Sequence, residues 1–207
     1  MFHTHKMMNK LIVISGCSAA GKTTLIDKLL AERPWTVRPV THTTRQPRAG
    51  EVDGVRYHFV SRGRFLAMIS QNEMIEFAEV HGNLYGTSKK AIQDVPAGTT
   101  VVAILDVEGA SSMRKAFPEC YTVFIDVPEN ELRRRLIERG DAEADVDRRM
   151  MTAAKEKMCR FEFDCIIENV EFDYASRALA SVFDRILVST PEKRSADESK
   201  HSVSVGA

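Results

Sequence analysis

Short apolar runs recur along the chain, separated by polar segments, and each run suits a strand buried on both faces. Such continuous runs are typical of a parallel sheet. Between them, apolar residues recur at the three-to-four-residue spacing of a helix. The predicted strands are 11–14, 100–105, 121–125 and 165–167, and the predicted helices are 23–33, 108–116, 129–139, 146 to about 160, and 174–188. Because strand and helix alternate, we predict the α/β fold class, a parallel sheet flanked by helices.

Residues 40–95 break this alternation and predict a small α+β insertion. Alternating stretches and helical patterns within it predict strands at 56–60, 74–80 and 84–87 and helices at 62–71 and 88–95. We therefore expect one domain over 1–188, with a core formed by 9–39 and 96–188. Residues 189–207 are polar, charged and poor in large apolar side chains, so a disordered tail is expected there.

Charge and composition narrow the possible partners. The 207 residues carry 29 Lys and Arg against 29 Asp and Glu, so the formal net charge is zero. The whole chain therefore has no electrostatic attraction to nucleic acid or to a membrane surface. Apolar runs of membrane-spanning length and a secretory signal pattern are both missing, and the four cysteines form no C-x-x-C pair, so we expect reduced thiols and a cytoplasmic location. The oligomeric state does not follow from the sequence.

Residues 16–23, which follow the first apolar run, read Gly-Cys-Ser-Ala-Ala-Gly-Lys-Thr. A G-x-x-x-x-G-K-T loop between a strand and a helix predicts a phosphate-binding loop (P-loop) and a P-loop nucleoside triphosphate hydrolase-like sheet. Glycines let backbone N–H groups turn toward phosphate oxygens, and the next helix directs its positive end at them. Lys22 would contact the outer phosphates of ATP, and the Thr23 hydroxyl would coordinate Mg²⁺. The predicted nucleotide-binding residues here are Gly16, Ser18, Gly21, Lys22, Thr23 and Thr24.

Cys17 lies inside this loop, close to the predicted helix N-terminus. A helix N-terminus favours the thiolate form of a cysteine. We therefore expect a reactive Cys17 and mild inhibition by thiol reagents.

A second loop, 41–54, concentrates hydroxyl and guanidinium groups. Arg45 and Arg48 are three residues apart and precede Tyr57, so their guanidinium groups can bind a phosphate dianion together. The alternative is a solvated basic turn.

Four segments together closely resemble the guanylate kinase family: 16–23, 41–54, 75–87 and 106–109. The T-T-R-x-P-R-x-G-E-x-x-G block at 43–54 is highly specific, and the resemblance continues through 135–140 to Asn169. It implies a P-loop core, a GMP-binding insertion and a mobile helical lid at about 129–160. The implied reaction is ATP + GMP = ADP + GDP, with Mg²⁺ as the cofactor that accompanies ATP.

The resemblance also implies roles for residues at matching positions. Asn169 would belong to the ATP site. Arg45, Arg48, Tyr57 and Tyr85 would hold the GMP phosphate, and Thr41, Glu76 and Thr87 would face the guanine. Guanine presents donors at N1 and its amino group, which suit the Glu76 carboxylate, and an acceptor at O6, which suits a hydroxyl. The alternative for Glu76 is an ordinary exposed strand residue.

One departure from the family pattern concerns the segment 104–109, which reads Ile-Leu-Asp-Val-Glu-Gly. Family members usually carry an acid two positions before the aspartate, where this chain has Ile104, and a glutamine where it has Glu108. Loss of a polar partner to a buried base costs about 1–3 kcal/mol, so weaker guanine selectivity or another acceptor is left open. Two roles stay open for Asp106. It could belong to the substrate site and orient water around the metal ion, or it could cap the helix that follows.

Arginines gather in the predicted lid. By resemblance, Arg135, Arg139 and Arg149 would close over the phosphates, neutralise the transferring group and exclude water. Such runs otherwise indicate a solvated helical face, which is what we expect of Arg133 and Arg134.

Two other functions remain as alternatives. One is a kinase for a different phosphorylated acceptor, a nucleotide or a sugar phosphate, which Ile104 motivates. The other is a non-catalytic guanylate-kinase-like module that binds phosphopeptides. Lys22 and Thr23 favour an enzyme, because such modules typically have a degraded phosphate loop.

Overall fold

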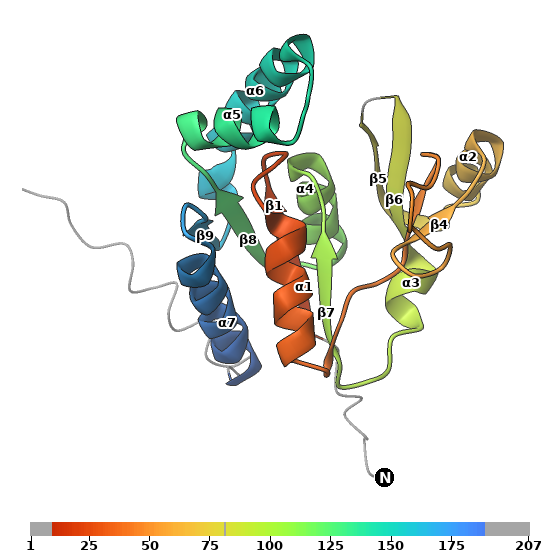
Figure 1. Cartoon of the computed structure of the whole chain (residues 1–207). Helices are drawn as coiled ribbons and strands as arrows, with labels where there is room; N and C mark the ends of the chain where they lie inside the picture. The colour runs from red at the N-terminus through yellow and green to blue at the C-terminus, as the bar shows by residue number, and fades with distance from the viewer. Residues whose placement is uncertain (1–9, 81, 189–207) are drawn as a thin grey trace, which may run out of the picture.

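The structure is a computed structural model that describes residues 10–80 and 82–188. Its centre is a five-stranded parallel sheet in the order β2-β7-β1-β8-β9 (Figure 1). The strands are β1 (Lys10–Gly16), β2 (Thr36–Val37), β7 (Thr100–Ile104), β8 (Tyr121–Asp126) and β9 (Cys165–Glu168). This confirms the predicted α/β class and all four predicted core strands. β2 was not predicted, because two residues carry no readable periodicity.

Helices cover both faces of this sheet, as the alternation in β1 requires. Ile12 and Ile14 point to one face and pack with α1 (Lys22–Glu32) and α7 (Phe172–Val188). Leu11 and Val13 point to the other face and pack with α4 (Val107–Ala116). Figure 1 shows α5 (Glu129–Glu138) and α6 (Glu143–Met158) together beyond the end of β1, followed by a 3₁₀ turn, η1 (Arg160–Glu162). The helices α5 and α6 thus lie beyond the carboxyl end of β1, the edge of a parallel sheet at which ligands bind (Figure 1).

A second, four-stranded sheet lies to one side, in the order β4-β3-β6-β5. Its elements are β3 (Thr41–Thr43), β4 (Tyr57–Phe59), α2 (Arg62–Ser70), β5 (Met74–Val80), β6 (Asn83–Ser88) and α3 (Lys89–Gln93). A small apolar core of Phe65, Met68, Met74 and Leu84 supports it. β3 was missed because its residues, Thr-His-Thr, are all polar.

Helix boundaries differ from the sequence predictions by up to three residues, for local reasons. α6 begins at Glu143 rather than Val146, because Glu143 and Asp145 occupy its first turn and complement the helix dipole. α4 begins one residue early, at Val107, because Asp106 caps it. The predicted tail, 189–207, lies outside the described residues.

Two further expectations concern the whole chain. None of the helices within residues 10–80 and 82–188 is long and apolar enough to span a membrane. All four cysteines are free thiols, and Cys17 and Cys120 are buried.

Candidate active site

The loop between β1 and α1 takes the conformation expected of a P-loop, and glycine is required at both of its ends. Gly16 has φ +136°, and a Cβ there would lie 2.2 Å from the carbonyl oxygen of Ile125. Gly21 has φ +83°, and a Cβ there would lie 2.5 Å from Nδ2 of Asn169. Thr23 and Thr24 follow in the first turn of α1, both exposed. The loop therefore lies against β8 and Asn169, with two hydroxyl groups at its open side.

The Lys22 ammonium folds back onto this loop. It donates to the carbonyl oxygens of Gly16 at 2.5 Å and Cys17 at 2.8 Å. Burial lowers the pKa of Lys22, and the charges of Glu156, Cys17 and Asp106 oppose that shift. A phosphate would offer this buried cation a stronger partner than two carbonyl groups do.

Glu156 is a site residue that sequence reasoning missed. Burial raises the pKa of its carboxyl, while the charge of Lys22 acts in the opposite direction. Glu156 is on α6, three residues after Ala153, whose carbonyl oxygen lies 3.6 Å from the Cys17 Sγ, and seven after Arg149. Residues 149, 153 and 156 are spaced so that they share one face of a helix. The sequence pattern alone does not show what this face contacts, because that depends on where α6 packs.

The expectation for Cys17 is wrong. Its side chain is fully buried, and burial raises the pKa of the thiol to about 12, with the Glu156 carboxylate adding to the rise. Desolvation outweighs the helix N-terminus because α6 covers the loop at Ala153. Cys17 is therefore a packing residue in this structure.

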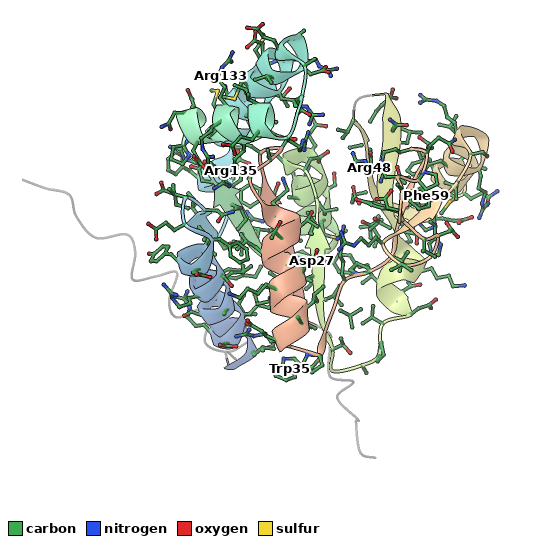
Figure 2. The ribbon with its side chains drawn as sticks, viewed as in Figure 1. Asp27, Trp35, Arg48, Phe59, Arg133 and Arg135 are labelled. Atoms are coloured by element: carbon green, nitrogen blue, oxygen red, sulfur yellow. The ribbon has the colours of Figure 1, made fainter. Side chains whose placement is uncertain are left out.

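The three arginines predicted to close over the phosphates occupy different environments. Arg149 donates from Nη1 to the Ser18 hydroxyl at 2.9 Å, directly on the P-loop. Arg135 donates to Glu131 at 2.8 Å and to the backbone oxygen of Asn169 at 2.7 Å, and Figure 2 shows it on the sheet side of α5. Arg139 is half-exposed and pairs with Asp141 at 2.8 Å.

Asp141 connects two of these arginines, because its Oδ2 also lies 3.3 Å from Nε of Arg149. The Arg133 and Arg134 side chains are about half exposed, as predicted for a solvated face, and pair with Asp147 and with Glu131 and Glu138 respectively. Arg135 and Arg149 thus lie at the P-loop. Arg139 is linked to Arg149 through their shared partner, Asp141.

Asn169, which was predicted to belong to the ATP site, binds the backbone of the P-loop through its side chain. It is 3 % exposed, and Nδ2 donates to the carbonyl oxygen of Ala20 at 2.8 Å. Its Oδ1 is buried without a hydrogen-bond partner in the described part of the chain. Asp126, which sequence reasoning missed, forms an ion pair with Lys157 at 2.8 Å and links α6 to the end of β8.

The second loop forms a preorganised cationic cluster. Arg45 makes a two-pronged ion pair with Glu51, with both N–O distances 2.9 Å, and Arg48 donates its backbone N–H to the same carboxylate at 2.7 Å. These bonds lower the pKa of Glu51 to about 2. The Arg45 guanidinium lies 5.6 Å from the Tyr57 ring, whose centroid is 6.1 Å from that of Tyr85.

All four residues predicted to hold a phosphate therefore belong to one cluster. The Arg48 side chain, labelled in Figure 2, is exposed. The organising residue, Glu51, was not predicted. Glu51 follows Arg45 by six residues and Arg48 by three within the same turn. This spacing was the sequence signal for its role as their partner.

The residues predicted to face a guanine converge where β5 and β6 meet α4. Glu76 is 6 % exposed, which rules out the alternative of an exposed strand residue. A Cβ on Gly109 would lie 3.1 Å from both the Glu76 Oε2 and the Asp106 Oδ1, so these carboxylates are close neighbours. Burial raises the pKa of Glu76 to about 7, the Asp106 charge adds to the rise, and Thr87 opposes it.

Thr87 lies in this pocket on β6, whereas Thr41 lies on the neighbouring strand, β3. The Thr87 hydroxyl is buried beside Glu76: it makes no hydrogen bond of good geometry within the described residues, yet it is near enough to oppose the rise in the Glu76 pKa. Thr41 is half-buried on β3, opposite Tyr57. An acid and an unsatisfied hydroxyl thus share one buried place.

Of the two roles left open for Asp106, the structure shows the cap. Its Oδ1 accepts from the backbone N–H of Gly109 at 2.6 Å, at the start of α4. Ile104, two residues earlier, pairs with Ile14 in the sheet and packs against the core. It contributes no polar group to the pocket.

Comparison with known proteins decides the family of this chain. The family model described as guanylate kinase matches residues 8–186. The chain belongs to the guanylate kinase family. A guanylate kinase of Alkalilimnicola ehrlichii is 44% identical over 180 residues, which are 86% of this chain and 89% of that protein. A guanylate kinase of Hahella chejuensis is 42% identical over 190 residues, 89% of this chain and 91% of the relative.

Solved structures agree with this family assignment. The crystal structure of guanylate kinase from Anaplasma phagocytophilum superposes on this chain with a TM-score of 0.71 at 27% identity. The match covers 96% of this chain and 98% of the solved chain. The guanylate kinase fold thus extends over nearly the whole chain, and the predicted resemblance is confirmed.

Proposed function

We propose that this protein transfers the γ-phosphoryl group of ATP to GMP, giving ADP and GDP. The observation that carries the proposal is the buried pair of Glu76 and Thr87, an acceptor and an unsatisfied hydroxyl side by side. Guanine offers two donors for the carboxylate and one acceptor, O6, for the hydroxyl. Family membership and the P-loop support the same reaction.

The acceptor phosphate would lie against Arg45, Arg48, Tyr57 and Tyr85. Arg45 and its Glu51 partner are already fixed, so phosphate binding orders few side chains there. One oxygen of the GMP phosphate attacks the γ-phosphorus, and the bond from that phosphorus to the β–γ bridging oxygen breaks to release ADP. The nucleophile is anionic, so no protein base is needed, and the protein positions the groups and stabilises charge.

The donor phosphates would bind the P-loop, and the cations around it would balance the charge. Lys22 would leave the carbonyl groups of Gly16 and Cys17 for the transferring group, together with Arg135 and Arg149. Arg139 would join them by exchanging Asp141 for phosphate. We further propose that 40–95 acts as the acceptor-binding insertion and about 129–160 as the lid, in a cytoplasmic enzyme.

Mg²⁺ fits the chemistry of the loop. Thr23 presents an exposed hydroxyl next to Lys22, an oxygen donor of the kind Mg²⁺ prefers. The described residues hold no group of three His, Cys, Asp or Glu that would bind a metal by itself, so phosphate oxygens and water would supply the other ligands. When bound, the ion neutralises phosphate charge.

A coupled assay for ADP formation tests the proposal. ATP and magnesium would be supplied with GMP, AMP, CMP, UMP or ribose 5-phosphate in turn. We expect turnover with GMP to exceed turnover with each other acceptor by at least about tenfold, as loss of one buried polar partner predicts. Preference for a different acceptor would contradict the GMP assignment, and lack of ADP with every acceptor would favour a phosphopeptide-binding module.

A further inference from the structure

A cavity of about 960 Å³ lies on the other face of the four-stranded sheet from the GMP residues. In β3 and β4, Thr41 pairs with Tyr57 and His42 pairs with His58, and successive residues of a strand point to opposite faces. His42 and His58 line the cavity, together with α2, α3 and the two segments, 37–40 and 93–96, that join the two sheets. The residues that we assign to ATP or GMP do not line it.

The four Arg and Lys side chains that line this cavity exceed its three acids by one, and two of these cations lack an ion-pair partner within the described residues. Arg64 pairs with Glu73 at 3.4 Å, and Lys90 pairs with Asp94 at 4.0 Å. The third lining acid, Asp53, accepts a hydrogen bond from the backbone N–H of Phe59 at 2.7 Å. Among the described residues, Arg38 and Lys89 line the cavity without an ion-pair partner.

Two nitrogen atoms of the lining are also unsatisfied. Nη1 of Arg38 and Nδ1 of His42 are buried and make no hydrogen bond within the part of the chain that the structure describes. Each buried unsatisfied polar group costs free energy that an acceptor oxygen would recover. Both atoms belong to cavity-lining residues, so an anion placed there would satisfy two groups that the protein leaves unpaired.

The rest of the lining favours a flat apolar group. The rings of His42 and His58 lie 4.9 Å apart between centroids and form an aromatic wall. Val60, Met68 and Val95 supply apolar surface around it. The volume falls in the range typical of small-molecule sites.

We propose that this cavity is a binding site for a small aromatic anion, a flat ring bearing a phosphate, sulfonate or carboxylate, whose charge is held by Arg38, His42 and Lys89. The site is separate from both substrate sites. A ligand there touches both segments that join the sheets. The Arg38 guanidinium also lies 5.9 Å from the ring of Tyr57, a residue that we assign to the acceptor phosphate. Occupancy would therefore fix the orientation of the two sheets.

Binding is expected to strengthen as the pH falls. Burial, His58 and Arg64 lower the pKa of His42, whereas Glu73 and Asp53 raise it. A bound anion adds negative charge beside His42, so the complex takes up a proton that the free protein lacks. Affinity is therefore greater at about pH 6 than at about pH 8.

The probe for this site is 1-anilinonaphthalene-8-sulfonate, an aromatic monoanion whose fluorescence rises in apolar surroundings. It would be titrated into the full chain with saturating Mg·ADP and GMP, a pair that occupies both substrate sites without turnover. We expect one equivalent of dye to bind, and Arg38→Gln to weaken it about tenfold, as loss of one charge-assisted hydrogen bond predicts. The matched control is Arg62→Gln on α2, whose guanidinium pairs with Glu79 away from the cavity and which should leave binding unchanged.

Two further arms separate charge from apolar binding and guard against misfolding. The neutral analogue N-phenyl-1-naphthylamine should bind about tenfold more weakly, and His42→Gln should abolish the pH dependence. Lys89→Gln provides a second weakened variant if Arg38→Gln unfolds. Displacement of the dye by Mg·ADP and GMP, or equal binding of charged and neutral probes, would overturn the proposal without bearing on GMP phosphorylation.

Discussion

Glu76 and Cys17 are both buried at the active site, and burial shifts each group toward its uncharged form. The consequences differ because of position. Cys17 packs under α6, where an inert thiol costs nothing in function. Glu76 lies in the pocket that we assign to guanine, where the ionised carboxylate is the better acceptor for two donors.

The first prediction concerns this carboxylate. Glu76→Gln should lower kcat/KM for GMP by about 10- to 100-fold, because a charge-assisted hydrogen bond is replaced by a weaker one, and should reduce GMP-over-AMP preference. In the wild type, KM for GMP should rise as the pH falls through about 7, because the carboxyl becomes protonated there. The variant lacks this titration and provides the control for protonation of GMP itself. Parallel pH profiles for the two proteins would contradict the assignment.

The second prediction concerns backbone strain in the P-loop. Ala19 has φ +65°, a left-handed conformation that costs a residue with a Cβ about 1 kcal/mol. Ala19→Gly should therefore raise the free energy of unfolding by about that amount, measured by urea denaturation. The same substitution at Ala154, exposed within α6, should lower it by a similar amount, because glycine is a poor helix former. Destabilisation at Ala19 would show that the loop is not strained there.

At the scale of elements, α6 determines much of the phosphate site. Its face at Arg149, Ala153 and Glu156 covers the P-loop, and Asp126 and Lys157 fasten its far end to β8. One helix thus places a cation on the P-loop, buries Cys17 and places a carboxylate near Lys22.

A third prediction tests this face. Arg149→Met should reduce kcat about 100-fold with little change in KM for GMP, because the guanidinium stabilises charge that develops only during transfer. Arg148→Met is the matched control, since Arg148 is exposed and pairs with Asp145 on the same helix. Steady-state kinetics of both variants provides the comparison. Equal losses in the two variants would assign the effect to helix stability instead of phosphate contact.

The sequence predicted the elements that carry a period or a motif, and missed those that depend on distant partners. Buried strands and amphipathic helices are local patterns, so the core sheet and its helices could be predicted. β3 has no apolar residue, and its pairing with β4 and β6 is long-range. Glu156 and Asp126 acquire their roles only when α6 packs against β8 and the P-loop, which no local pattern specifies.

At the scale of the whole molecule, two sheets divide the work. The parallel sheet presents the P-loop at the end of β1, and the four-stranded sheet presents the arginine cluster and Glu76. α4 joins them: its N-terminal Asp106 and Gly109 lie against Glu76 of β5. The residues that we assign to the donor and to the acceptor are therefore different, and we expect both sites to be filled together.

Calorimetric titration of GMP into protein saturated with Mg·ADP measures whether both nucleotides bind at once. One equivalent of GMP should bind, with an affinity no weaker than in the absence of ADP. Competition between the two nucleotides for a single site would contradict it.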